Sequence, residues 1–345
     1  MNFSKHWAAT LDDYAIDLAW SPDGAILAAA SAAGSISLFD HAQGVVLHEF
    51  EGHLDGANCL AWMPAPKAHS SALSAPQLLA SGGQDGHVRF WNTSTDVPPH
   101  DLKLGTAWVE HLGWQPAAST PLLFAAAGKK LVALRSDGSL AHTFPDAPKS
   151  ITALAWRADG TACAVAYFGG VCVWDATTFA VQKEFPYGNT IHALTWSPDG
   201  RWLVAGCQDN AVHLWAPAED VELHMSGYET KLKELSFSHD SKWLATGGGQ
   251  DACIWDCEGA GPEGRTPLQF PHKTRVCATA FQNTHSLLAT AAVDGEFCLW
   301  SPSRKNPLVA EVKMPSPAAK FAWRGDDTLL AVGTERGNIF VFKTD

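Results

Sequence analysis

The stretch from Ile191 to Trp215, IHALTWSPDGRWLVAGCQDNAVHLW, constrains the fold of this chain more than any other part of the sequence. Its three short apolar runs, IHALTW, RWLVAG and AVHLW, place Val, Ile, Leu and Trp at alternating positions, and branched and aromatic side chains favour strands. The segments between them contain Pro-Asp-Gly and Asp-Asn, which favour turns. The stretch therefore predicts three antiparallel strands joined by tight turns.

The same pattern occurs eight times along the chain. In each copy the first strand ends in an aromatic residue, 40 to 52 positions after the previous one: Trp20, Trp62, Trp114, Trp156, Trp196, Phe237, Phe281 and Trp323. The third strand also ends in an aromatic residue, except in the third copy, which has Leu134. Apolar residues do not recur at the 3.6-residue spacing of a helical repeat. Four-stranded repeats of roughly 40–45 residues are typical of propeller blades.

The second copy carries the most informative motif. Gly52-His53 is followed by Ser81-Gly82-Gly83-Gln84-Asp85-Gly86 and then by Trp91. On these residues the chain resembles the WD-repeat β-propellers, and the repeats extend the resemblance over nearly its whole length. In that family a histidine, a serine, a turn aspartate and a tryptophan form a hydrogen-bonded chain within the blade. The resemblance implies these parts for His53, Ser81, Asp85 and Trp91.

The other copies keep this motif only in part. The six-residue separation of Asp85 and Trp91 occurs again in two pairs: Asp209 with Trp215, and Asp294 with Trp300. The Gly-His pair occurs only in the second copy, and the first, third and eighth copies lack the turn aspartate. We therefore expect most blades to depend on packing rather than on this hydrogen-bonded chain.

The repeats predict an all-β fold, a single closed propeller of four-stranded antiparallel blades. Fourth strands are expected between successive copies, and the one missing at the C-terminal end is expected from the N-terminal segment Lys5–Ala9. Pairing of the two ends would close the ring and remove exposed edges. We predict one domain over residues 1–345, with residues 1–14 as closing strand and connection and eight repeats from 15 to 344. Eight blades are preferred, and seven, the usual number in the family, is the alternative.

Composition narrows the class of partner and the compartment. The net charge of −12 argues against a nucleic-acid partner, because phosphate binding needs a basic surface. The sequence contains no apolar run long enough to span a bilayer and no recognisable secretion signal. Its eight cysteines lack disulfide-framework spacing, which suits a reducing compartment. We expect a cytoplasmic monomer without membrane contact, and the compact Ala- and Trp-rich repeats resemble those of a bacterial member of the family.

Catalytic motifs are absent from the sequence. It has no Gly-x-Ser-x-Gly elbow, phosphate loop, His-Glu-x-x-His or Cys-x-x-Cys. The recurring aspartates fall in turns, where their side chains hydrogen-bond the local backbone. The chain is therefore predicted not to be an enzyme, although a propeller fold alone does not exclude a site in its channel.

Aligned first strands define one ring of residues that the family architecture places on the central channel. Three residues before the terminal aromatic, the first three copies have Asp17, Cys59 and His111. A carboxylate, a thiol and an imidazole are ligand types for zinc. We therefore hypothesise a channel metal site at these residues. The alternative is that they are ordinary polar residues of a wet channel wall, with no cofactor bound.

The residues one position earlier define a second ring, at the strand ends that open on the upper face in the family. Its candidates for partner contact are Asn58, Glu110, Thr152, His192, Lys233 and Cys277. This mixed polarity suits recognition of a protein or peptide. The preferred function is thus a non-catalytic interaction scaffold that binds a protein or peptide on its upper face. The alternatives are a metal-binding or metal-handling protein and, third, an enzyme with a channel site.

Overall fold

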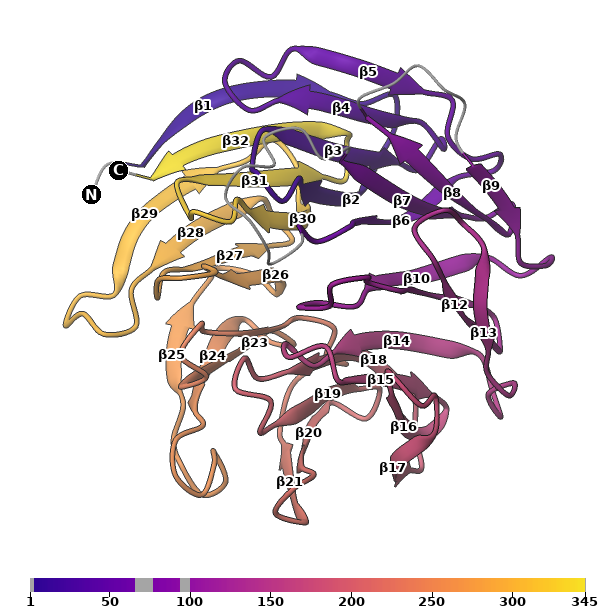
Figure 1. Ribbon diagram of the computed structural model, residues 1–345. Helices are drawn as coiled ribbons and strands as arrows, with labels where there is room; N and C mark the ends of the chain where they lie inside the picture. Colours follow the sequence, from indigo (N-terminus) through magenta and orange to yellow (C-terminus); the bar gives the residue numbers. More distant parts are fainter. Residues whose placement is uncertain (1–2, 66–76, 94–99, 345) are drawn as a thin grey trace. The chain divides into compact units, whose positions relative to one another are not determined.

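A computed structural model describes residues 3–65, 77–93 and 100–344 (Figure 1). The described residues form strands and turns without a helix, so they contain no helix that could span a membrane. By their internal contacts the residues divide into two compact units, residues 11–188 and residues 1–10 with 189–345. Each unit contains four antiparallel four-stranded sheets.

In the unit of residues 11–188, successive strands pair in chain order within each sheet. The sheets are β2 (Ala15–Trp20), β3 (Ile26–Ser31), β4 (Ile36–Asp40) and β5 (Val46–Phe50); β6 (Ala57–Trp62), β7 (Leu78–Gly83), β8 (His87–Asn92) and β9 (His100–Lys103); β10 (Val109–Trp114), β11 (Leu123–Ala127), β12 (Lys130–Leu134) and β13 (Leu140–Thr143); and β14 (Ile151–Trp156), β15 (Ala162–Tyr167), β16 (Gly169–Asp175) and β17 (Val181–Tyr187).

The second unit repeats this arrangement. Its first three sheets are β18 (Ile191–Trp196), β19 (Leu203–Cys207), β20 (Ala211–Ala216) and β21 (Val221–Ser226); β22 (Leu235–Phe237), β23 (Trp243–Thr246), β24 (Asp251–Asp256) and β25 (Leu268–Pro271); and β26 (Val276–Phe281), β27 (Leu288–Ala292), β28 (Glu296–Trp300) and β29 (Leu308–Lys313). The fourth contains β30 (Ala318–Trp323), β31 (Leu329–Thr334), β32 (Asn338–Thr344) and, from the other end of the chain, β1 (Phe3–Thr10).

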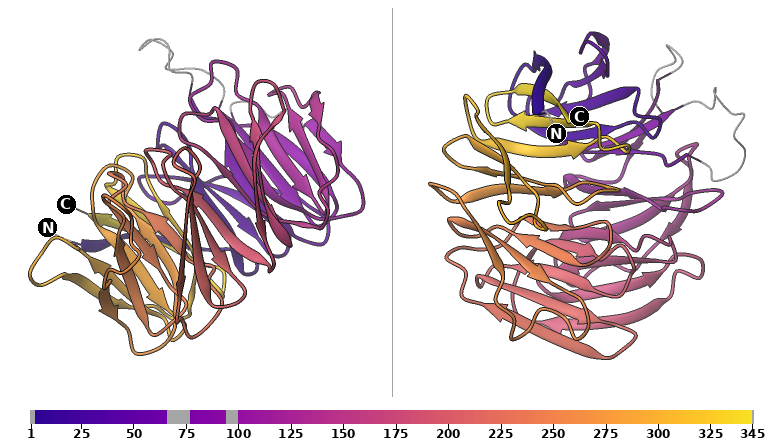
Figure 2. Two further views of the ribbon diagram at one scale, coloured as in Figure 1. Left: turned by 90° about the horizontal axis from the view of Figure 1, so that it is seen from below. Right: turned by 90° about the vertical axis from the view of Figure 1, so that its left-hand side faces the viewer.

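The N-terminal strand completes the last sheet, as the sequence predicts. β1 lies beside β32 with Phe3 opposite Thr344 and Thr10 opposite Asn338 (Figures 1 and 2). Phe3 also stacks on Phe297 and Phe342, at ring-centroid distances of 5.4 and 4.8 Å. The fold is therefore an eight-bladed propeller of four-stranded antiparallel sheets, and the seven-bladed alternative is wrong. That all 345 residues act as one domain stays a prediction.

The second and third strands of each sheet supply most of the core. The segments LAAA of β3, LFAAA of β11 and LATAA of β27 are buried throughout. First-strand tryptophans add a specific contact between neighbouring sheets. The indole N–H of Trp62 donates to the Ala19 carbonyl at 2.9 Å, and Trp114, Trp156 and Trp323 make the same bond to the preceding sheet of their unit.

The topology gives each sheet an upper edge. We define it as the edge where the first strand begins, the second and third strands are joined, and the fourth strand ends. Backbone hydrogen bonds connect these segments, for example from Ala32 to Tyr14 and from Gln84 to Gly56. The upper edge therefore contains the sheet-to-sheet connections, and the candidate recognition residues lie along it.

Candidate protein-interaction surface

The first strands share a β-bulge at their second residue. In seven of the eight sheets that the structure describes, the first residue of the first strand pairs with a residue of the second strand. The second residue of the first strand is skipped, and pairing with the second strand resumes at the third. The skipped residues are Ile16, Asn58, Glu110, Thr152, His192, Cys277 and Ala319. A bulge bends its strand and redirects the unpaired side chain. Five of the six predicted contact residues are therefore bulge residues, and Lys233 is the exception because it precedes β22.

In the unit of residues 11–188, three bulge residues have different surroundings. The Asn58 amide donates to the Val109 carbonyl at 3.2 Å, and the Thr152 hydroxyl lies 3.4 Å from the Ala166 carbonyl. Glu110 remains exposed, and partial burial of its carboxyl group raises its pKa. Asn58 and Thr152 are thus held in place by the fold, whereas Glu110 presents a carboxyl group to solvent.

The second unit contains the other three candidates. His192 Nε2 lies 2.5 Å from Gln208 Oε1, across the upper edge of one sheet. Cys277 Sγ donates to the Ala318 carbonyl at 3.3 Å, and burial together with the charge of Glu234 raises its pKa to about 12. Lys233 is exposed in the connection before β22. These side chains differ in charge and hydrogen-bonding capacity, so the upper edge of this unit is chemically mixed.

Exposed apolar side chains lie on the upper edge of the unit of residues 11–188. Leu54 is 75% exposed in the connection from β5 to β6, and Trp108 is 50% exposed in the connection from β9 to β10. Phe168 is 49% exposed between β15 and β16. Binding residues are often found in such connections, and exposed apolar side chains can be buried by a partner. Sequence periodicity did not single them out because they lie outside the strands.

A buried hydrogen-bonded chain holds the sheet β6–β9 together. The Trp91 indole donates to Ser81 Oγ at 2.8 Å, and Ser81 Oγ lies 2.8 Å from His53 Nε2. His53 Nδ1 lies 2.9 Å from Asp85. With a proton on His53 Nδ1, the chain runs from Trp91 N–H to Ser81, from Ser81 O–H to His53 Nε2, and from His53 Nδ1–H to Asp85. Arg89 Nη1 also donates to Asp85 at 2.8 Å. Burial, opposed by the Asp85 hydrogen bond and charge, lowers the pKa of His53, which suits the neutral ring.

Glycine is required beside this histidine. A Cβ atom on Gly83 would lie 2.3 Å from the Cγ atom of the His53 ring. The glycine of the Ser-Gly-Gly segment therefore leaves room for the imidazole to reach Ser81.

A second chain of the same type occurs in the sheet β26–β29. The Trp300 indole donates to Thr290 Oγ1 at 2.7 Å, which lies 2.7 Å from His272 Nε2. His272 Nδ1 then lies 2.8 Å from Glu296 Oε2. Thr290 precedes Trp300 by ten residues, as Ser81 precedes Trp91, and this spacing is the signal that could have found it.

The turn aspartate Asp294 does not repeat the role of Asp85 in the contacts that the structure describes. Asp294 accepts hydrogen bonds from Lys313 Nζ at 2.9 Å and from the Glu296 backbone at 3.1 Å, while Glu296 takes the place beside the histidine. The six-residue spacing suggested that Asp294 belongs to the same hydrogen-bonded chain as Trp300. In the structure Glu296 occupies that place in the chain instead. Trp215 is buried, and His213 packs edge-on against its ring. Asp209 lies in the turn before β20.

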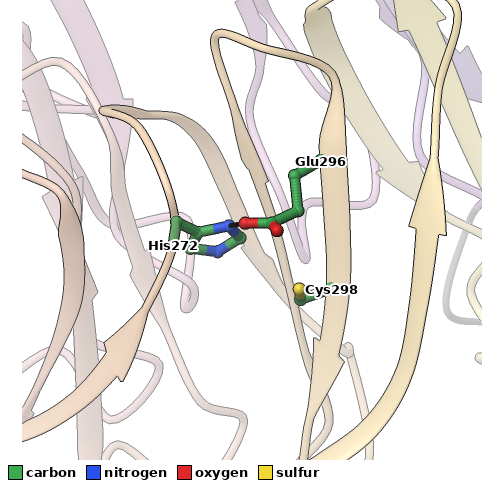
Figure 3. A group of neighbouring side chains, drawn as sticks. All are labelled: His272, Glu296 and Cys298. Carbon is green, nitrogen blue, oxygen red and sulfur yellow. Dashed lines mark hydrogen bonds and ion pairs between the residues drawn. The ribbon is translucent and has the colours of Figure 1, made fainter.

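One group of side chains among the described residues has the ligand types and spacing that could hold a metal ion. It consists of His272, Glu296 and Cys298, and one ligand atom of each lies within 4.8 Å of the others (Figure 3). A metal would compete with existing bonds, since both nitrogens of His272 are engaged and Lys273 Nζ lies 2.8 Å from Glu296. Burial and the charge of Glu296 raise the pKa of Cys298 to about 12, so the thiol keeps its proton at neutral pH. A metal bound here would have to displace this proton as well as the bonds of His272 and Glu296. The cluster fits the hydrogen-bonded chain better than a metal.

The predicted metal ligands Asp17, Cys59 and His111 follow their bulges on three neighbouring first strands. The two Asp17 oxygens accept the backbone N–H groups of Leu18 at 3.0 Å and Leu60 at 2.9 Å. Cys59 Sγ lies 3.7 Å from the Val109 carbonyl, and burial lowers the pKa of His111 to about 4. Among the described residues the three do not form a group with all ligand atoms within 4.8 Å. The structure therefore does not bring them together.

Comparison with protein families agrees with this repeated-sheet architecture. The model for the WD domain, G-beta repeat, matches residues 44–92, 181–216, 221–256 and 265–301. The model for the WD40 domain of anaphase-promoting complex subunit 4 matches residues 1–65. The two together cover more than half of the chain, which belongs to the WD-repeat family.

Among individual proteins, this chain is 22% identical over 230 residues to protein transport protein sec13 of Emericella nidulans, covering 63% of this chain and 62% of that protein. It is 24% identical to anaphase-promoting complex subunit cdc20 of Dictyostelium discoideum, covering 65% and 53% respectively. It is also 24% identical to target of rapamycin complex subunit LST8 of Mus musculus, covering 73% and 80%. The chain spans 49–62% of the length of the first five curated relatives.

A solved structure supports the fold alone. The crystal structure of the computationally designed Ika8 protein matches with a TM-score of 0.80 and 18% identity, covering 99% of this chain and all of that one.

Proposed function

We propose that this chain is a non-catalytic scaffold that binds a protein or peptide segment along the upper edges of its sheets. The observation that carries the proposal is the exposure of Leu54, Trp108 and Phe168 at three separate connections of one unit. Such side chains supply binding energy when a partner removes them from water. The bulge residues add polar groups beside them.

The chemistry of six of the eight thiols argues against a cysteine nucleophile among them. Burial raises the pKa of Cys163, Cys172, Cys253, Cys257, Cys277 and Cys298. A thiol needs a lowered pKa to act as a nucleophile at neutral pH. Two of the relatives are named as subunits of protein complexes, which is consistent with a scaffold.

The test compares two triple variants of the full chain. Leu54→Ser with Trp108→Ser and Phe168→Ser removes the exposed apolar groups of the upper edge. The matched control is Val45→Ser with Val46→Ser and Leu140→Ser, which changes similarly exposed residues away from it. Quantitative affinity purification from the native cell extract should identify a stoichiometric partner with the parent and control, but not with the upper-edge variant. A partner retained by both variants would contradict the proposal.

A further inference from the structure

A groove lies beside the upper edge of the unit of residues 11–188. It has a volume of about 300 Å³ and is formed mainly by the connection from β13 to β14 together with the sheet β14–β17. Pro145, Pro148, Tyr167, Trp174 and Val181 contribute its largely apolar walls. Val181 is 48% exposed in the outermost strand, so the groove opens to solvent along β17.

Two carboxylates, Asp146 and Glu184, lie in this apolar lining. Within the part of the chain that the structure describes, neither has a recorded ion pair. Glu184 is paired across the ladder with Cys172, and its charge adds to burial in raising the pKa values of Cys172 and Tyr167. Because both carboxylates are exposed, the solvent-facing part of the groove lining is negative.

Lysines close to the groove in the sequence do not line it. Lys183, next to Glu184, lies over the Phe185 ring at 5.6 Å from its centroid. Lys149 is exposed in the β13–β14 connection but does not line the groove. The lining of the groove therefore contains two carboxylates and no lysine or arginine.

We propose that this groove receives a lysine or arginine side chain of a protein segment bound to the upper edge. A long basic side chain buries its methylene stem against apolar walls while its charged end pairs with carboxylates. The faces of Tyr167 and Trp174 can also attract a cation. The inference rests on the proposed function and adds the chemical class of the partner.

Continuity with the upper edge favours a protein segment over a free amine. Tyr167, in the groove, directly precedes the exposed Phe168 in the sequence. The Pro145–Pro148 wall belongs to a sheet-to-sheet connection of the upper edge itself. A bound segment can therefore place an apolar residue against Phe168 and a basic residue in the groove.

The experiment selects binders from a random peptide library displayed on phage, with the full chain as bait. Enriched sequences are synthesised, and their affinity is measured by fluorescence anisotropy for the parent, Glu184→Lys and Val181→Ser. The matched control is Glu49→Lys, which makes the same charge change at an exposed site of another outermost strand, β5. Each peptide is also tested with its lysines and arginines replaced by glutamine.

We expect enriched peptides that combine apolar and basic residues. Glu184→Lys and the glutamine peptides should each weaken binding severalfold, because the first replaces an attraction by a repulsion and the second removes the positive charge. Glu49→Lys should bind like the parent. Peptides without basic residues, or binding unchanged by Glu184→Lys, would overturn the inference. If such binding is still abolished by the upper-edge triple variant, the proposed function stands; if neither variant weakens it, both fail.

Discussion

At the scale of single residues, one hydroxyl group in each buried chain connects a tryptophan to a histidine. Ser81 accepts from Trp91 and donates to His53, and Thr290 does the same for Trp300 and His272. An apolar replacement would leave two polar groups without a partner inside the sheet. Each such group costs about 1–3 kcal/mol.

Ser81→Ala should therefore lower the free energy of unfolding by about 2 kcal/mol or more. Urea unfolding followed by tryptophan fluorescence measures this loss. Ser136→Ala, at an exposed serine of the same unit, should leave the unfolding midpoint unchanged. Equal midpoints for Ser81→Ala and the parent would contradict the assignment of the chain.

His111 should make the fold sensitive to mild acid. Burial lowers its pKa from 6.5 to about 4, so below about pH 6.5 the unfolded state takes up a proton that the folded state does not. Above pH 6.5 the neutral His111 ring does not lower the free energy of unfolding. As the pH falls from 6.5 to about 4, protonation of His111 in the unfolded state progressively lowers the free energy of unfolding. At pH 5 we expect the loss to be about 1–2 kcal/mol.

Thermal unfolding at pH 7.5 and pH 5 tests this effect. His111→Gln should show a smaller fall in Tm between the two pH values than the parent. His239→Gln, at an exposed histidine, should keep the parent's fall. A parent and His111→Gln with identical pH dependence would rule out the role of His111.

The sequence allows only part of the residue-scale picture to be predicted. The four residues of the His53 chain follow from the family motif. The His272 chain was missed because Pro271 stands where the motif has glycine and Glu296 replaces the turn aspartate. Strand alignment identified Asp17, Cys59 and His111 as equivalent positions, but alignment does not show where side chains point. Asp17 bonds backbone N–H groups instead of converging with the other two.

At the scale of elements, the aromatic residue at the end of the first strand acts between sheets as well as within one. The Trp62 indole donates to the carbonyl of Ala19 on the neighbouring first strand. Trp62→Phe keeps an aromatic ring but removes this donor, so it should cost about 1–2 kcal/mol. Trp108→Phe, at an exposed tryptophan, is the control for calorimetric measurement of Tm. An equal Tm for the two variants would contradict the contribution of the indole bond.

Strands could be predicted because alternating apolar residues and turn motifs are local signals. The turns also follow local chemistry, since Ser238 Oγ donates to Asp240 at 2.5 Å as Ser197 does to Asp199. There Ser241 takes the place of the turn glycine with a φ of 62°. The bulges could not be predicted, because a bulge is a mismatch in register between two strands. The exposed apolar residues of the upper edge could not be predicted from periodicity, because they lie in connections rather than in strands.

At the scale of the whole molecule, one compact unit is a continuous segment of the chain and the other combines segments from both ends. The unit that contains residues 189–345 takes its last strand, β1, from residues 1–10. We predict that co-expressed fragments 1–188 and 189–345 co-purify, because β1 pairs with β32 and Phe3 stacks on Phe342. Removing residues 1–10 from the first fragment should weaken co-purification and leave the edge of β32 open to aggregation. Size-exclusion chromatography measures both effects, and undiminished co-purification would contradict the prediction.

The recurring bulge separates two tasks that most strands combine. A side chain in a regular ladder position packs against its neighbours, so changing it disturbs the sheet. The residue skipped by the ladder has no cross-strand partner. Where the skipped side chain lies in solvent, as Glu110 does, we expect substitution to cost little free energy of folding. Seven blades contain such a position. On the proposed function, evolution or design could change binding specificity at these positions while the paired residues of the strands stay the same.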